Sequence, residues 1–238
     1  GNSADYGGGG VYCLYGTVTF TNNTISQNSD ANIGGGVYCW GTTVTFVNNT
    51  ISGNSSGSDG GGVDCAFSVV ATFTGDTITG NSADRYGGAV DCKNSTATFN
   101  NCTISGNSGQ YGGGVYVYSS NVTFDNCTMS GNSASLDGGS VYSTYESGLT
   151  FTSCTILTSS ADRWGGGVCC SYTQATFMKT VFTGNFASRG GGFYCDGVGA
   201  NFTNCVFSGN SPQALYLGAG SGFVHCTLHA NPRGIELH

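Results

Sequence analysis

The stretch TVTFTNNTIS, residues 17–26, returns in modified form along the whole chain, and it decides the fold. Each copy places an apolar residue five positions after a central phenylalanine, as with Phe20 and Ile25. The central phenylalanines are Phe20, Phe46, Phe73, Phe99, Phe124, Phe151, Phe177, Phe202 and Phe223. Their apolar partners are Ile25, Ile51, Ile78, Ile104, Met129, Ile156, Phe182, Phe207 and Leu228. The units are about 25–27 residues long, a period that is typical of solenoids.

Inside a unit, the hydrophobic pattern has a period of two. Val18 and Phe20 share one face of the chain, and Thr19 points the other way. This alternation of β-branched and aromatic residues predicts β-strands. Glycine clusters at residues 7–10 and 34–36 separate the strands, since glycine allows tight corners. We therefore expect one all-β domain over residues 1–238, a right-handed parallel β-helix (β-solenoid) of about nine rungs, with atypical C-terminal rungs at 209–238.

The composition restricts the partners and the compartment. A net charge of −7 with only six Lys and Arg residues disfavours nucleic acid, which is bound by basic patches. No apolar run approaches the ~20 residues of a membrane span, so no membrane insertion is expected. Twelve cysteines in 238 residues indicate an oxidising, extracellular setting at or near a cell surface.

Two short motifs connect the repeats with a known family. GGAV at residues 87–90 has the form GGA followed by an aliphatic residue, and FTNN at 20–23 and FVNN at 46–49 have the form FxxN. With these motifs the sequence resembles the repeats of chlamydial polymorphic outer membrane proteins. The resemblance implies a parallel β-helix, display at a surface and adhesion. In later units cysteine replaces the final asparagine of the second motif, at Cys102, Cys127, Cys154, Cys205 and Cys226.

All cysteines except Cys169 fall into two columns whose members come from equivalent positions of the rungs. One column is Cys13, Cys39, Cys65, Cys92, Cys170 and Cys195, and the other is Cys102, Cys127, Cys154, Cys205 and Cys226. Adjacent strands lie within the Cα separation that a disulfide needs. The candidate bridges are Cys13–Cys39, Cys65–Cys92, Cys170–Cys195, Cys102–Cys127 and Cys205–Cys226. The alternative is a set of buried free thiols. No metal site is expected, because no CxxC motif occurs.

Asn-X-Ser/Thr sequons mark candidate glycosylation sites of a secreted chain. They are Asn22, Asn48, Asn54, Asn94, Asn101, Asn121, Asn126 and Asn201. Four of them share one outward turn position, where a glycan would be accommodated: Asn22, Asn48, Asn101 and Asn126.

Two outward columns are candidates for surface binding. The first consists of tyrosines that would stack on sugars or dock a neighbouring molecule, namely Tyr12, Tyr38, Tyr116, Tyr142, Tyr194 and Tyr216. The second consists of threonines beside the phenylalanines, namely Thr19, Thr45, Thr72, Thr98, Thr123, Thr150 and Thr176. The threonine column resembles the ice-binding faces of antifreeze proteins, but a parallel column that starts at Thr17 does not persist. The alternative for both columns is an ordinary strand surface.

Asp64 and Asp91 occupy the outward position of Tyr12 in adjacent rungs. Two carboxylates about 5 Å apart are able to share a proton or a calcium ion. A polysaccharide hydrolase or lyase would need such acids together with a base, and Lys93 is the basic residue close in sequence. The alternative is a pair of solvated surface aspartates.

An asparagine column recurs at the Gly-Asn-Ser boundary between units, starting at Asn2 and Asn28 and broken by Ser159. Asparagine is typical of turns, and stacked amides are able to bond to one another along the axis as a ladder. We expect a structural role for this column.

These features favour a non-catalytic extracellular protein that needs no cofactor. The expected role is a rigid rod or filament subunit that associates end to end, with adhesion as a related role. Glycans or another cell-surface polymer are the further expected partners. One alternative is a β-helix protein that degrades or binds polysaccharide near Asp64 and Asp91, and another is ice binding through the threonine column.

Overall fold

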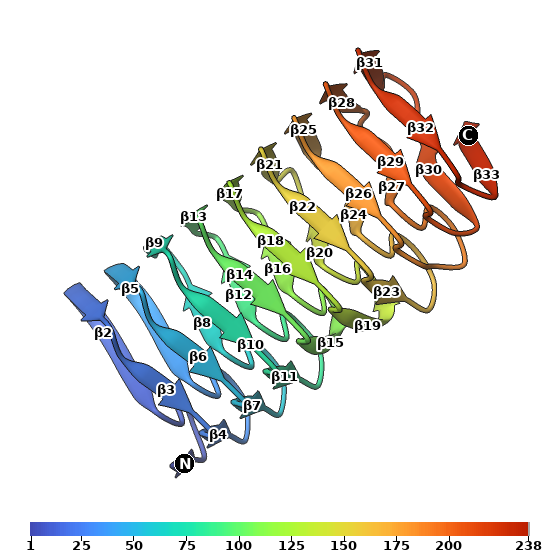
Figure 1. Cartoon of the computed structure of the whole chain (residues 1–238). Coiled ribbons are helices and arrows are strands. Elements are labelled where there is room, and N and C mark those ends of the chain that lie inside the picture. The colour runs from blue at the N-terminus through green and yellow to red at the C-terminus, as the bar shows by residue number, and fades with distance from the viewer. Residues whose placement is uncertain (238) are drawn as a thin grey trace.

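The phenylalanine repeat builds a rod of stacked coils in the computed structural model, which describes residues 1–237 (Figure 1). The elements are all β-strands, and the two ends of the chain lie at opposite ends of the rod. Strands pair in parallel with the equivalent strands of the neighbouring coils. The predicted parallel β-solenoid is therefore confirmed. No helix of residues 1–237 has the length and apolar character needed to cross a bilayer.

Two of the three sheets contain one kind of strand each. The seven-stranded sheet comprises β1 (Ser3–Ala4), β4 (Ser29–Asp30), β7 (Ser55–Ser56), β11 (Ser82–Ala83), β15 (Ser108–Tyr111), β19 (Ser133–Asp137) and β23 (Ser160–Ala161). The nine-stranded sheet comprises β3 (Thr24–Ser26), β6 (Thr50–Ser52), β10 (Thr77–Thr79), β14 (Thr103–Ser105), β18 (Thr128–Ser130), β22 (Thr155–Leu157), β26 (Val181–Thr183), β29 (Val206–Ser208) and β32 (Thr227–His229).

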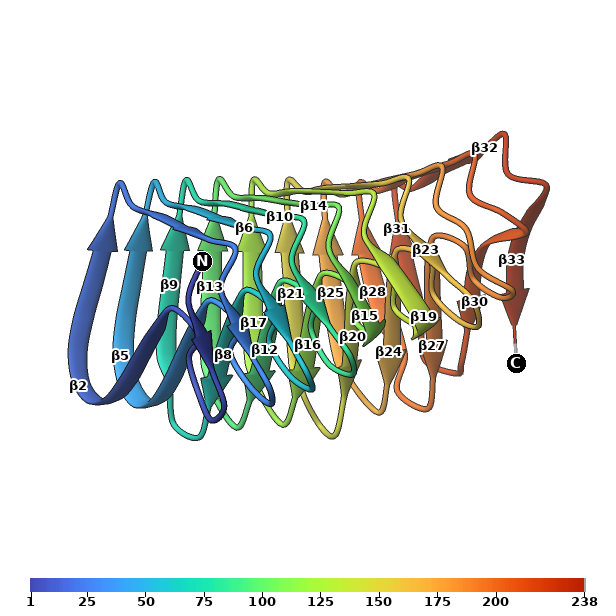
Figure 2. The same ribbon diagram turned by 90° about the horizontal axis from the view of Figure 1, so that it is seen from below.

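The third sheet has 17 strands and two halves. Its valine half comprises β8 (Val63–Ala66), β12 (Val90–Lys93), β16 (Val115–Tyr118), β20 (Val141–Thr144), β24 (Val168–Ser171), β27 (Phe193–Asp196), β30 (Gln213–Leu217) and β33 (Arg233–Leu237). Its phenylalanine half comprises β9 (Val70–Thr74), β13 (Thr96–Asn100), β17 (Asn121–Asp125), β21 (Gly148–Thr152), β25 (Gln174–Met178), β28 (Ala200–Thr203) and β31 (Gly222–Val224). In the first two coils one long strand runs through both halves, as Figure 2 shows for β2 (Val11–Thr21) and β5 (Val37–Val47).

In-register pairing stacks like residues in the core. The rings of Phe73 and Phe99 lie with centroids 4.5 Å apart and planes 4° apart, and Ile78 pairs with Ile104. The predicted inward columns are confirmed, and their members in the interior coils are fully buried. Burying one such phenylalanine contributes about 1.5–3 kcal/mol, whereas fixing each residue's backbone costs about 1–2 kcal/mol. One coil alone is therefore unstable, and the stack is what folds.

A column of buried asparagines fixes the register between coils. The Asn107 side chain accepts hydrogen bonds from the backbone and side-chain amides of Asn81, at 2.9 and 3.1 Å. It donates to the Ile78 carbonyl and to the Asn132 side chain, both at 3.0 Å. The residue before each asparagine takes the left-handed conformation, as Gly106 does at φ 61°. The predicted turn and amide ladder are thus confirmed.

Replacement of a core phenylalanine tests the contribution of this stack. We expect Phe99→Ala to lower the free energy of unfolding by about 3–5 kcal/mol, because the ring leaves a cavity between two neighbouring rings. The matched control is Thr98→Ala, whose side chain faces outward and whose loss should change stability by less than about 0.5 kcal/mol. Urea unfolding followed by circular dichroism measures both, and equal effects would contradict the assignment of the two faces.

Candidate functional site

Asp64 on β8 and Asp91 on β12 lie in register in adjacent coils. The interpretation of these residues as solvated surface aspartates is wrong, because they are only 2% and 0% exposed. The segment before each glycine cluster folds over this face of the sheet. Asp59 lies in that segment and forms a β-bridge with Tyr86 of the next coil, and its carboxylate lies within 4.8 Å of those of Asp64 and Asp91. The site is therefore a cluster of three acids, of which Asp64 and Asp91 are buried and Asp59 is half-buried.

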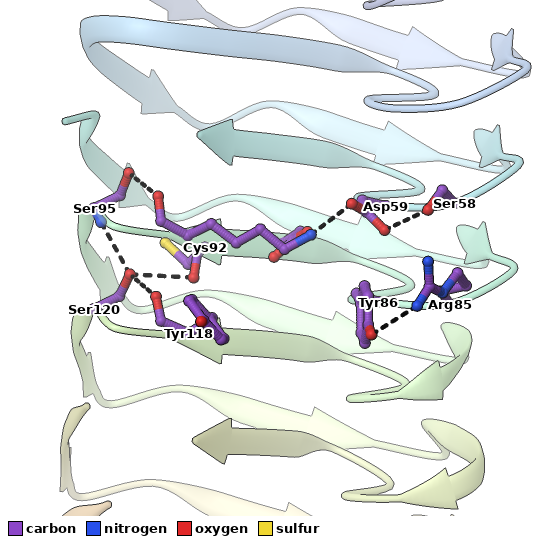
Figure 3. A network of polar contacts seen from close by, with 10 residues as sticks. Ser58, Asp59, Arg85, Tyr86, Cys92, Ser95, Tyr118 and Ser120 are labelled. Atoms are coloured by element: carbon purple, nitrogen blue, oxygen red, sulfur yellow. Dashed lines mark hydrogen bonds and ion pairs between the residues drawn. The ribbon is translucent and has the colours of Figure 1, made fainter. Parts of the chain in front are cut away.

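Lys93, at the end of β12, supplies the positive charge of this cluster. Its ammonium lies 2.5 Å from Asp59 Oδ2 and 2.8 Å from Asp91 Oδ2. Ser58 Oγ donates to the other oxygen of Asp59 at 2.7 Å, as Figure 3 shows. The ammonium also lies 4.7 Å from the centre of the Tyr86 ring, close enough for a cation–π interaction. Lys93 thus joins two coils through charge and ring contacts.

The burial of the cluster changes its proton affinity. Burial raises the pKa of Asp64 well above its usual value, and the charge of Asp91 adds to this effect. Burial also raises the pKa of Asp91 to about 7. The positive charge of Lys93 lowers this pKa, and the charge of Asp59 raises it, but burial has the largest effect. Burial alone would lower the pKa of Lys93, but the carboxylates of Asp91 and Asp59 outweigh it and raise that pKa. Asp91 therefore titrates near neutral pH while Lys93 stays charged.

The chemistry available to this cluster is limited by access. Three convergent carboxylates and a base are the groups that a polysaccharide hydrolase or lyase needs. Carboxylate oxygens within 4.8 Å of one another also suit calcium, but the ammonium of Lys93 already bridges Asp59 and Asp91. Because Asp64 and Asp91 are buried, a polymer substrate has no direct contact with them. The cluster is best described as a buried ion pair with a titratable carboxyl.

The same covering segment buries most of the predicted tyrosine surface. Tyr38 and Tyr116 are each 5% exposed, so the prediction that they face solvent is wrong, as it also is for Tyr194 and Tyr216. The ring of Tyr86 lies over that of Tyr116, with centroids 4.5 Å apart. Tyr142 is half-buried, and Tyr12 in the first coil is exposed. The four buried tyrosines form an inner layer beneath the covering segment.

The threonine column lies where the sequence predicts it. Thr19 pairs with Thr45, and Thr72 pairs with both Thr45 and Thr98. Thr19 is exposed and the other three are half-buried. The sequence analysis missed a more regular hydroxyl pair on the nine-stranded sheet, where in each of the first five coils a threonine and a serine or threonine flank the buried apolar residue. Its members in the first five coils are Thr24, Ser26, Thr50, Ser52, Thr77, Thr79, Thr103, Ser105, Thr128 and Ser130.

One of the sequons is not available for glycosylation. Asn54 is buried in the asparagine ladder and donates to the Ile25 carbonyl and the Asn81 side chain, so this candidate site is wrong. The remaining candidates lie at exposed positions: Asn22, Asn48, Asn94, Asn101, Asn121, Asn126 and Asn201. Glycan attachment at these residues stays a prediction.

The cysteine columns stack as expected, and the structure contains their side chains as thiols. Cys13 pairs with Cys39, and Cys65 with Cys92, as neighbours in register. The other column continues the FxxN turn. There the Cys127 thiol donates to two backbone carbonyls, and its sulfur lies 3.4 Å from the Cys102 amide nitrogen, which donates to it. A thiol at this turn therefore makes some of the hydrogen bonds that the asparagine makes in the earlier coils. The five disulfide bridges stay a prediction.

Two kinds of site residue escaped the sequence analysis. Asp59 and Tyr86 were missed because they lie in the segment before the glycine cluster. The alternation of apolar and polar residues does not predict where this segment packs. A pattern was present there, since equivalent positions of this segment carry mostly large or charged residues: Ile33, Asp59, Tyr86, Tyr111, Asp137, Trp164 and Arg189. Exposed tyrosines at one corner of the rod, Tyr145 and Tyr172, were also missed, because turn residues have no periodic signal.

The raised pKa of Asp91 predicts a pH-dependent stability. Between its usual pKa of 3.8 and the folded value of about 7, the unfolded chain releases a proton that the folded chain retains. The free energy of unfolding should therefore fall as the pH rises from about 4 to about 7. Asp91→Asn, which mimics the neutral acid, should remove this part of the dependence. Thermal unfolding of both proteins across this range measures the difference, and a difference that is constant with pH would refute the assignment.

The predicted bridges are open to direct chemical measurement. Unfolding the protein from an oxidising preparation without reductant, alkylating it and mapping its peptides by mass spectrometry should recover the five cross-linked pairs. Cys154 and Cys169 should be alkylated. Because a bridge would restrict the unfolded chain, the reductant should also lower the melting temperature. Alkylation of every cysteine would show that both columns are thiols in solution.

Comparison with known proteins agrees with this architecture. No curated protein and no solved structure gives a significant match to the chain. A family model described as a right-handed β-helix region matches residues 88–238, which is more than half of the sequence. The matched part includes Asp91 and Lys93 and the later coils with the cysteine turns. The chain therefore belongs to the family of right-handed β-helix proteins.

Proposed function

We propose that this chain is a non-catalytic, extracellular rod that serves as a structural and adhesive component of a cell surface. One observation carries the proposal. Two of the acids that would be needed for catalysis, Asp64 and Asp91, are buried beneath a covering segment, whereas the outer faces repeat the same side chains in register from coil to coil. Such a surface matches a partner that is itself repetitive, such as a cell-surface polymer or a neighbouring rod.

The extracellular placement is supported by the covalent chemistry of the chain. Twelve cysteines, eleven of them in stacked columns, suit an oxidising compartment. Seven sequons at exposed positions suit a secretory route. The sparse charge of the chain, with six Lys and Arg and 13 Asp and Glu residues, is compatible with a glycan coat or a covering partner.

End-to-end association is the second part of the proposal. Val18 and Phe20 in the first coil and Phe223 and Leu228 near the last are only half-buried, unlike their interior counterparts. A hollow of about 570 Å³ opens beside Phe223 and is lined by apolar groups that include Ile235 and Leu237. In an end-to-end contact, the first coil of one copy would lie on the last coil of another. The core columns of the two coils would then cover each other, and their free strand edges would pair. Repetition of this heterologous contact gives a filament.

Electron microscopy of the purified chain over a range of concentrations tests the rod proposal. We expect rods of constant width that lengthen as the concentration rises. Leu237→Asp places a charge on an exposed apolar end residue and should shorten the rods, since pairing would bury that charge. The control is Met178→Asp, a similar change at an exposed site on the side of the rod, which should leave their length unchanged. Short rods of one length at every concentration would refute end-to-end association.

A further inference from the structure

Three adjoining hollows lie at one corner of the rod, where the chain passes from the valine half to the phenylalanine half of the large sheet. The middle hollow, of about 530 Å³, is lined by Thr144, Tyr145, Glu146, Ser171, Tyr172 and Val198. A hollow of about 410 Å³ shares Glu146 and Tyr172 with it, and one of about 220 Å³ shares Thr144 and Tyr145. We call these three hollows the corner groove.

The backbone at this corner would suit glycine better than the residues that the chain places there. Tyr145, Glu146 and Tyr172 have φ values of 56°, 52° and 51°, a conformation that is uncommon for residues with a side chain. Other coils meet the same corner with glycine at Gly41 and Gly197, with small polar residues at Asn94 and Ser119, and with aromatic residues at Tyr15 and Phe67. The fold does not require an aromatic residue at this position. The corner accepts small, polar and aromatic residues alike, so the two neighbouring tyrosine rings are a property of these coils and not of the turn.

The two rings are held in place and remain accessible. Tyr145 and Tyr172 are 62% and 65% exposed. A Cβ atom built on Gly197 would lie 3.1 Å from the Tyr172 ring, so that ring rests against the bare backbone of the next coil. The backbone amide of Glu146 donates to the Tyr172 carbonyl at 3.0 Å, and the ring of Tyr145 lies 4.6 Å from that of Tyr118. Because these contacts already restrict the two rings, the rings lose little conformational entropy when they bind a partner.

The polar groups beside the rings indicate the chemistry of the partner. Glu146 contributes a carboxylate, and Asn121 and Gln174 contribute amides to the second hollow. Carboxylates and amides bind hydroxyl groups, and an aromatic face packs against the C–H face of a sugar ring. The one cation that lines the groove, Arg163, is already hydrogen-bonded to Asp137. Since no free cation among residues 1–237 lines the groove and the chain has a net charge of −7, an anionic polymer is disfavoured.

We propose that the corner groove binds a neutral oligosaccharide or polysaccharide. Tyr145 and Tyr172 stack on its sugar rings, and Glu146 accepts hydrogen bonds from its hydroxyl groups. Adjacent coils are about 4.8 Å apart, so the groove holds a short run of sugar units along the rod axis. This inference rests on the proposed adhesive role and names the class of partner that one face of the rod recognises.

Titration calorimetry with defined oligosaccharides tests the proposal. The neutral probes are β-1,4-linked glucose, N-acetylglucosamine and mannose oligomers, and the anionic probe is oligogalacturonate. We expect at least one neutral probe to bind, and Tyr172→Gly to weaken it at least about tenfold. Glycine suits the left-handed corner, so this variant should keep its fold. Glu146→Gln should weaken binding less, because the amide still accepts one hydrogen bond.

Tyr15→Gly is the matched control. Tyr15 is also 65% exposed, has φ 56° and lies against Gly41, but it is in the first coil, away from the groove. Its replacement should leave the affinity for sugars unchanged. Absence of binding by every neutral probe, tighter binding of oligogalacturonate, or equal affinity of Tyr172→Gly and the unmodified chain would overturn the proposal. Rod length in the electron microscope does not depend on this groove, so failure of the glycan site and failure of end-to-end association are separate results.

Discussion

Register between successive coils is the constraint on which the rest of the rod depends. The buried amide column enforces it, because a slip by one residue would leave amide groups without partners in the interior, at about 1–3 kcal/mol each. The same slip would turn the core side chains outward. Ser159 interrupts the column without breaking it. Its hydroxyl accepts from the Asn132 amide at 3.3 Å, and its own amide donates to the Asn185 side chain at 3.0 Å. Any side chain that both accepts and fits preserves the register.

Local alternation was sufficient to predict the core from the sequence. The phenylalanine and isoleucine columns follow from a period of two within each repeat. Stacking of the repeats in register then places equivalent residues one above the other. This reasoning fails for residues whose burial depends on contacts with the neighbouring coil. Asn48 and Asn54 both carry a sequon, yet the first is exposed at a turn and the second is buried in the ladder. The sequon is a three-residue motif, whereas burial is decided by a residue about 26 positions away.

The covering layer was not predictable in this way. Tyr38 and Asp64 share an outward position with the exposed Tyr12, and alternation treats the three alike. They differ because the segments that contain Asp59 and Tyr86 pack over the interior coils. This packing turns an expected surface into an inner layer and raises the proton affinity of two carboxyls. Which segment lies over which face is a tertiary property, so a single strand pattern does not contain it.

The corner turns separate the stability of this rod from its recognition. Tyr15 and Gly41 occupy equivalent corner positions in successive coils, with the same hydrogen-bonded core beneath them. A residue at such a corner is therefore free to change without repacking the interior. New binding residues are able to arise one coil at a time, at positions whose spacing is already fixed by the distance between paired strands. The surface of such a rod is therefore a series of nearly independent sites on one unchanged support.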